Sequence, residues 1–233
     1  MKAILQILLL ALLCAPGVAQ APRAAAGNAD LERVLDGMDR AAANFRTGQA
    51  DFVWEQYEKV INETDVQKGT IYFRRRGNEI QMAADIREPE KKYVLFTDGK
   101  VRLYQPRIEQ VTEYNAGKNK QEFESFLVLG FGAKGHDLLR SFDVSYAGSE
   151  VVDGKPAAKL LLVPKSQRVR GMFDKIYLWI DPARGVSVRQ QFIEPSGNYR
   201  LAKYTNIQLN QPLADNVFKL QTTSKTKVVR PQG

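Results

Sequence analysis

Apolar and polar residues alternate along most of the chain with the two-residue period of a β-strand. The stretch 69–84 reads GTIYFRRRGNEIQMAA, in which Ile71 and Phe73 share one side of a predicted strand. The alternation stops at three consecutive arginines and resumes at Ile80 and Met82. The pattern therefore predicts a strand, a basic stretch and a second strand.

Alternating segments recur on both sides of one interruption, and several are joined by turns that contain Asp, Gly or Pro. Strands joined in sequence by short turns pair antiparallel, so a mainly β fold is predicted. Roughly ten to eleven strands make a sheet large enough to curl into a sandwich or barrel. The further segments are residues 52–54, 93–96, 101–104, 142–147, 150–152, 157–163, 175–180, 186–193 and 201–209.

Two segments follow the helical period instead. The first covers residues 30–45, and either Asn28 or Asp30 is a candidate N-cap. The second covers residues 122–140, where glycines divide one or two short helices. A curled sheet must fill its concave side, and we expect the two helical segments to cover it. Their apolar positions are Leu31, Val34, Leu35, Met38, Ala42 and Phe45, then Phe123, Phe126, Leu127, Phe131, Leu138 and Leu139.

The N-terminus is typical of an export signal. Lys2 is followed by an apolar stretch from Ile4 to Leu13, and small residues end at position 19. This apolar stretch is shorter than the roughly 18 residues that a transmembrane helix needs. The only cysteine, Cys14, lies inside the signal after Leu13 rather than a small residue, which favours cleavage over lipidation. We expect a signal peptide at residues 1–19 and a linker at 20–29.

The exported chain would have about 210 residues, enough for one domain with a sizeable core. The full sequence has a formal net charge of +8, and this charge falls by one when Lys2 is removed with the signal. The basic excess either attracts the protein to anionic surfaces such as phospholipid headgroups or only keeps it soluble. Binding of nucleic acid is not expected of an exported protein.

Polar residues suited to catalysis are scarce. His136 is the only histidine, and its neighbour Asp137 cannot face it on a helix, so a solvated or capping role is favoured. Asp98, Asp153 and Asp181 lie at predicted turns, where Asp supplies local hydrogen bonds. No cluster has the spacing of metal ligands. We therefore expect no enzyme activity, no metal and no cofactor.

Three stretches resemble the LolA family of periplasmic lipoprotein carriers. They are GTIYFRRRGNEIQM, REPEKKYVLFTDGKVRLYQPRIEQVT and VRQQFIEPSGNYRLAKYTNIQLNQPLADNVFKL, and their order extends the resemblance over most of residues 30–222. The resemblance implies an incomplete antiparallel β-barrel closed by an α-helical lid. It also implies a cavity for lipoprotein acyl chains, an inner-membrane ABC transporter as donor, an outer-membrane acceptor and a periplasmic location.

In that family an arginine after the early strand holds the lid through hydrogen bonds to the lid backbone. Arg75 shares the strand face of Ile71 and Phe73, whereas Arg74 and Arg76 point the other way, so Arg75 is the candidate latch. Its guanidinium has five fixed donors that can reach several carbonyl oxygens. The alternative is that all three arginines are solvated residues at a strand end.

The candidate cavity lining combines aromatic residues with Met, which offer an adaptable apolar surface. The alternative is that these residues form an ordinary core. The candidates are Phe52, Trp54, Ile71, Phe73, Ile80, Met82 and Leu103 on the sheet, and Phe123, Phe126 and Leu127 on the lid.

We expect a monomeric lipoprotein chaperone, with the carrier domain at residues 30–222 and a flexible basic tail at 223–233. The sequence departs from the family at Arg76, where many relatives have proline, and in a shortened loop before Tyr104. The tail also lacks a recognisable extra strand. These departures leave two alternatives open: a carrier of another lipid, such as a glycolipid or hopanoid, and a regulatory domain that senses lipid or lipoprotein.

Overall fold

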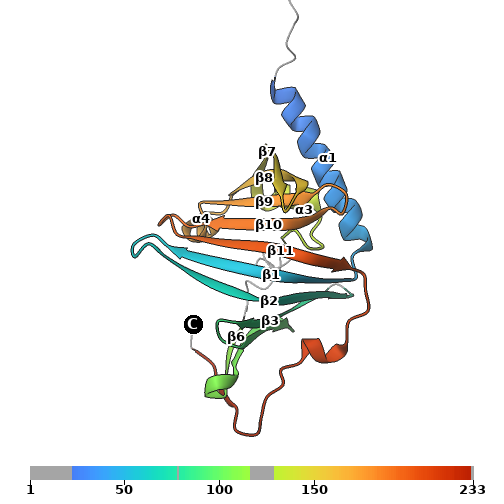
Figure 1. Ribbon diagram of the computed structural model, residues 1–233. Coiled ribbons are helices and arrows are strands. Elements are labelled where there is room, and N and C mark those ends of the chain that lie inside the picture. The colour runs from blue at the N-terminus through green and yellow to red at the C-terminus, as the bar shows by residue number, and fades with distance from the viewer. Residues whose placement is uncertain (1–22, 78, 116–128, 232–233) are drawn as a thin grey trace, which may run out of the picture.

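The structure is a computed structural model that describes residues 23–77, 79–115 and 129–231. Its strands form an open twelve-stranded sheet in the order β12-β6-β5-β4-β3-β2-β1-β11-β10-β9-β8-β7 (Figure 1). Neighbours pair antiparallel except β12 and β6, which are parallel. The first five strands from the N-terminus are β1 Thr47–Glu58, β2 Glu63–Arg76, β3 Glu79–Glu88, β4 Lys92–Thr97 and β5 Lys100–Gln105. The others are β6 Gln110–Asn115, β7 Phe142–Val152, β8 Lys155–Pro164, β9 Lys175–Asp181, β10 Val186–Ile193, β11 Tyr199–Leu209 and β12 Lys227–Val229.

The open sheet with helices on one side confirms the predicted mainly β, incomplete barrel. Strands from distant parts of the chain lie side by side in this sheet. β1 pairs with β2 along one edge and with β11 along the other. Alternation along each strand gives the sheet an inner face and an outer face. The inner face carries two large apolar clusters, one over β1–β4 and β11 and the other over β7–β9.

Helix α1, Arg23–Asn44, lies along one side of the sheet (Figure 1). It begins before Asn28 and Asp30, the predicted N-caps, so part of the expected linker 20–29 is helical. The reason is visible in the sequence, because Arg23 and the three alanines after it are strong helix formers. Leu35 and Met38 of α1 are buried against β7–β9.

The second helical segment is described from residue 129 onward. It contains a turn and then α3, Gly135–Ser141, which packs against α1 and β7. We call α1 and residues 129–141 the lid. The predicted lid residues Phe123, Phe126 and Leu127 lie outside the described residues. In the described part of the chain, no helix has both the length and the apolar character needed to cross a bilayer.

The outer face is crossed by the segment 213–221, which we call the strap. It contains a short 3-10 helix, η3 Asp215–Phe218, and buries Phe218 against Ala83 and Leu95. Another short 3-10 helix, η1 Pro106–Ile108, links β5 to β6, and helix α4, Gln167–Met172, follows β8.

The prediction of a flexible tail without an extra strand is wrong for residues 227–229, which form β12 along β6. The strand forms because β6 would otherwise present unpaired backbone groups at the sheet edge, which the tail can satisfy. Arg230 then donates to Glu113 over 3.0 Å. Hydrogen bonds from Arg102, Arg230 and Lys100 lower the pKa of Glu113 to about 2.

Candidate functional site: an apolar trough under a lid

The inner face of β1–β4 carries a buried apolar cluster, which we call the trough. Phe52, Ile71, Phe73 and Met82 are buried there in one cluster, together with Phe96. They meet because each has the parity that points inward on its strand, and neighbouring strands align them in register. Five of the predicted lining residues are therefore brought together, since Trp54 also packs against this cluster.

Trp54 is half-buried and stacks on Phe52 with ring centroids 4.1 Å apart. The other two predicted positions on the sheet lie further along the trough. Ile80 is buried opposite Arg75, and Leu103 is half-buried opposite Val94. The trough thus extends from β1 to β5.

Phe131 of the lid is the centre of the trough's cover. Its ring stacks on Phe73 at a centroid distance of 5.0 Å and meets Tyr204 edge-on at 4.9 Å. Only 1% of Phe131 is exposed. Phe131 was in the predicted apolar pattern of the lid, but its contact with β11 was not predicted. Its ring fills the space between the lid and the sheet.

A buried polar chain ties the lid segment to the sheet beneath Phe131. Tyr204 donates to Oε1 of Gln190 over 3.2 Å, and Nε2 of Gln190 donates to the carbonyl of Leu129. Burial raises the pKa of Tyr204 well above its ordinary value, so its hydroxyl keeps its proton. The backbone N–H of Ser187 adds a bond of 2.8 Å to the Gly130 carbonyl. Sequence reasoning missed this chain because its members lie far apart in the sequence.

Arg75 lies at the rim of the trough and reaches the lid. Its Nη2 donates to the backbone carbonyl of Gly132 over 2.8 Å. The contact has the geometry of a latch, with one donor of the guanidinium engaged on a carbonyl that follows Phe131.

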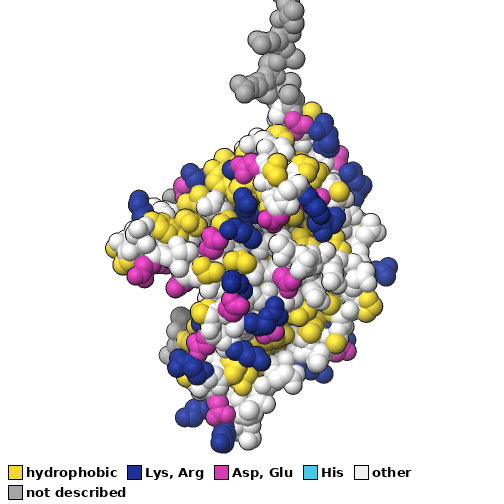
Figure 2. Space-filling view, in the orientation of Figure 1, with side chains coloured by type: hydrophobic (Ala, Val, Ile, Leu, Met, Phe, Trp, Pro, Cys, Tyr) yellow, Lys and Arg dark blue, Asp and Glu magenta, His cyan; other side chains and the backbone are white. Residues whose placement is uncertain are grey.

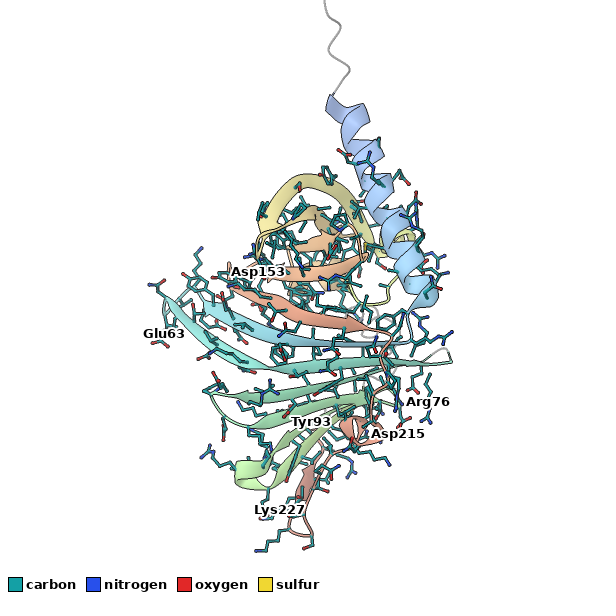
Figure 3. All side chains as sticks on the ribbon, turned by 45° about the vertical axis from the view of Figure 1, so that its right-hand side comes forward. Glu63, Arg76, Tyr93, Asp153, Asp215 and Lys227 are labelled. Carbon is teal, nitrogen blue, oxygen red and sulfur yellow. The ribbon has the colours of Figure 1, made fainter. Side chains whose placement is uncertain are left out.

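Arg74 points to the opposite face, as its parity predicts. It pairs with Asp215 of the strap, its guanidinium carbon lies 4.2 Å from the centroid of the Phe218 ring, and its Nε donates to Gln81 over 3.0 Å. Arg76 is exposed. The arginine run therefore serves both faces of the strand: Arg75 reaches the lid and Arg74 holds the strap. Figure 3 labels the third arginine, Arg76, and Asp215 of the strap.

His136 joins the two parts of the lid rather than capping a helix. Its Nδ1 lies 2.7 Å from Oδ2 of Asp39, and its Nε2 lies 3.1 Å from Oε2 of Glu32, both on α1. The hydrogen bonds to Asp39 and then Glu32 raise the pKa of His136, favouring the imidazolium that donates to both carboxylates. Burial opposes ionisation of Asp39, but the bonds from His136 outweigh it and lower the pKa of Asp39.

The side chains that meet on the inner face are mainly apolar. The trough lining is aromatic and aliphatic, and Met82 adds a flexible side chain that adapts to different shapes. Among the residues that the structure describes, no group of three or more His, Cys, Asp or Glu could hold a metal ion.

The family model "Outer membrane lipoprotein carrier protein LolA" matches residues 43–221. This range begins in the last two residues of α1 and ends with the strap, so it includes the trough and residues 129–141 of the lid but not the rest of α1. No curated protein matches the chain significantly.

Solved structures share the fold at low sequence identity. An uncharacterized conserved protein of Thermus thermophilus is 14% identical with a TM-score of 0.55, covering 87% of this chain and 99% of its own. MucB is 18% identical with a TM-score of 0.54, covering 86% of this chain and 66% of the MucB chain. The MucA/MucB complex of Pseudomonas aeruginosa gives 17% identity, a TM-score of 0.50, and coverage of 86% and 63%.

Proposed function

The chain belongs to the LolA family of outer membrane lipoprotein carrier proteins, and from that premise we propose that it is a periplasmic chaperone for lipoproteins. In this proposal an inner-membrane ABC transporter delivers the lipoprotein, the trough shields its acyl chains from water, and an acceptor at the outer membrane receives them. The carrier acts as a monomer, without cofactor or covalent chemistry.

The observation that carries the proposal is the way Phe131 covers the trough. The ring lies between lid and sheet, and residues 129–132 around it accept hydrogen bonds from Arg75, from Gln190 and from the Ser187 backbone among the described residues. If this segment lifts, Phe131 leaves with it and exposes the apolar surface around Phe73.

Free energies favour a lid that opens at modest cost. Each methylene removed from water contributes about 0.8 kcal/mol, so a long acyl chain must be sealed from solvent during transport. The membranes at both ends bury the same methylenes, so this large contribution nearly cancels over the whole transfer. Small differences then decide the direction, and a very stable closed state would oppose loading by its own free energy of opening.

The two tryptophans allow a direct test, because they lie on opposite faces of the sheet. Trp54 packs against the trough cluster, whereas Trp179 packs on the outer face with Val152 and Ala157. A lipopeptide with brominated acyl chains quenches tryptophan fluorescence at short range. We expect strong quenching in Trp179→Phe, which retains Trp54, and weak quenching in Trp54→Phe. Equal quenching of the two variants would place the acyl chains elsewhere.

Arg75→Leu tests the proposed latch. Loss of the bond to Gly132 should favour the open lid and speed release of an acylated guest by about fivefold, the effect of roughly 1 kcal/mol for one partly exposed hydrogen bond. The midpoint of thermal unfolding should change little. Stopped-flow transfer from the loaded protein to acceptor vesicles measures the rate. Arg76→Leu is the matched control and should transfer like the wild type; a wild-type rate in Arg75→Leu would remove Arg75 from the mechanism.

A protein ligand is the second candidate, and it is raised by the shared fold with MucB, which was crystallised with MucA. A carrier of another lipid is the third. Native mass spectrometry of protein purified from its own periplasm separates the three: an acylated protein supports the chaperone, a free glycolipid or hopanoid supports the lipid carrier, and a non-acylated protein supports the sensor.

A further inference from the structure

The outer face has a hollow where the strap crosses the sheet. This strap cleft has a volume of about 350 Å³ and lies between β2–β5 and the strap. Three tyrosines, three lysines and one carboxylate contribute to its lining: Tyr72, Tyr93 and Tyr104, Lys91, Lys92 and Lys219, and Asp85. Tyr93 and the strap residue Asp215 are both labelled in Figure 3. The cleft is separated from the trough by the thickness of the sheet.

The tyrosines give the cleft uncharged aromatic walls. The hydroxyl of Tyr93 donates to the carbonyl of Val217, which fixes the strap over the strand. Burial, and then the nearby carboxylate of Asp85, raises the pKa of Tyr93 to about 12 and also raises the pKa of Tyr72. Both phenols therefore stay protonated in the neutral range, and neither adds negative charge that would offset the lysines.

The lysines of the cleft form no ion pair within the part of the chain that the structure describes. Elsewhere on the same surface lysines are paired, as Lys100 is with Glu113 at 3.2 Å and Lys159 with Glu150 at 2.6 Å. Asp85 is the one carboxylate in the lining, and its ion pair is with Arg87, at 3.9 Å.

Lys92 lies opposite Ile86 and has the parity of Val94 and Phe96, so its side chain belongs to the inner face of the sheet rather than to the cleft. The ammonium groups of Lys91 and Lys219 therefore stand against one carboxylate, Asp85, which leaves the cleft a positive excess.

We propose that the strap cleft binds a phosphate group carried by a small or amphiphilic molecule. Lysine binds phosphate as a point charge, and a tyrosine hydroxyl of the cleft other than that of Tyr93, whose proton is given to Val217, can donate to the phosphate oxygens. The volume is at the lower end of the range for small-molecule sites, about 300–1,000 Å³, and fits a headgroup-sized molecule. Lys and Arg side chains lie among hydrophobic and acidic ones over the lower part of the molecule (Figure 2). This site is independent of acyl chains in the trough.

The phosphate has two sources, a phospholipid headgroup and a free phosphate ester, and two probes distinguish them. One is sn-glycerol 3-phosphate, followed by NMR through the backbone amides of Tyr93 and Lys219. The other is a vesicle of phosphatidylglycerol and phosphatidylcholine, followed by co-sedimentation. The test variant is Lys91→Gln/Lys219→Gln. The control is Lys59→Gln/Lys225→Gln, which removes the same charge at lysines outside the cleft.

We expect binding of at least one probe to weaken about tenfold or more in the test variant, because each lysine near an anionic group contributes roughly 1 kcal/mol. The control should bind within about twofold of the wild type. Shifts with glycerol phosphate identify a site for free phosphate esters, and binding to vesicles alone identifies a headgroup site. No binding of either probe, or equal weakening in test and control variants, overturns the proposal. Quenching of Trp54 by brominated acyl chains should be the same in both variants, so a failure here is distinct from a failure of the chaperone function.

Discussion

Replacing Gly135 with alanine is expected to lower the free energy of unfolding by about 2–3 kcal/mol, the upper part of the usual range for overpacking. Gly135 is buried at the start of α3, and a Cβ there would lie 2.5 Å from the carbonyl oxygen of Leu35 and 2.6 Å from its Cα. These are backbone atoms of α1, so no side-chain rotation relieves the contact. One helix of the lid must move away from the other.

Gly171→Ala is the matched control, because Gly171 also lies in a short helix but a Cβ there meets nothing within 4 Å. Alanine favours helix over glycine, so this variant should be as stable as the wild type or more stable by up to about 1 kcal/mol. Urea unfolding measures both variants, and hydrogen exchange of residues 136–141 reports whether α3 is detached. Equal stability of the two alanine variants would mean that α1 and α3 are not in close contact.

Much of the architecture could be predicted because it depends on local periodicity. A two-residue period specifies which side chains share a face, and it correctly separated Arg75 from Arg74. The same rule brought Phe52, Ile71 and Phe73 into one cluster. Helical spacing likewise identified Leu35 and Met38 as the buried side of α1.

The remaining features depend on contacts between residues that are distant in the sequence. The periodicity of apolar and polar residues does not indicate such contacts. His136 and Asp39 are separated by 97 positions, and Arg74 and Asp215 by 141. The predicted start of the helix was wrong because the helix propensity of the alanines before Asn28 outweighs the N-capping preference of Asn28 and Asp30. The tail strand β12 was missed because three residues show no alternation that can be recognised, and only the free edge of β6 explains why they pair.

The position of Phe131 sets the relation between stability and guest binding. Its buried ring packs between the lid and the sheet, in contact with Phe73 and Tyr204. Under the proposed function, an incoming acyl chain must displace the ring, and these contacts are lost. Part of the free energy of binding is therefore spent on opening. A protein without this ring should be less stable when empty but should bind an acyl chain more tightly, provided that the chain occupies the volume of the ring.

Phe131→Ala is accordingly expected to lower the free energy of unfolding by about 3–5 kcal/mol without ligand, through lost contacts and the cavity left behind. A saturating acylated lipopeptide should restore more stability in this variant than it adds to the wild type. A ligand that binds only the folded state raises the free energy of unfolding by about 2.7 kcal/mol at 100 times its Kd, and by more when its Kd is lower. Thermal unfolding with and without lipopeptide measures both effects. Leu178→Ala is the control: Leu178 is fully buried in the other apolar cluster, so that variant should be destabilised yet gain only what the wild type gains. The same gain in Phe131→Ala as in Leu178→Ala would show that acyl chains do not replace the ring.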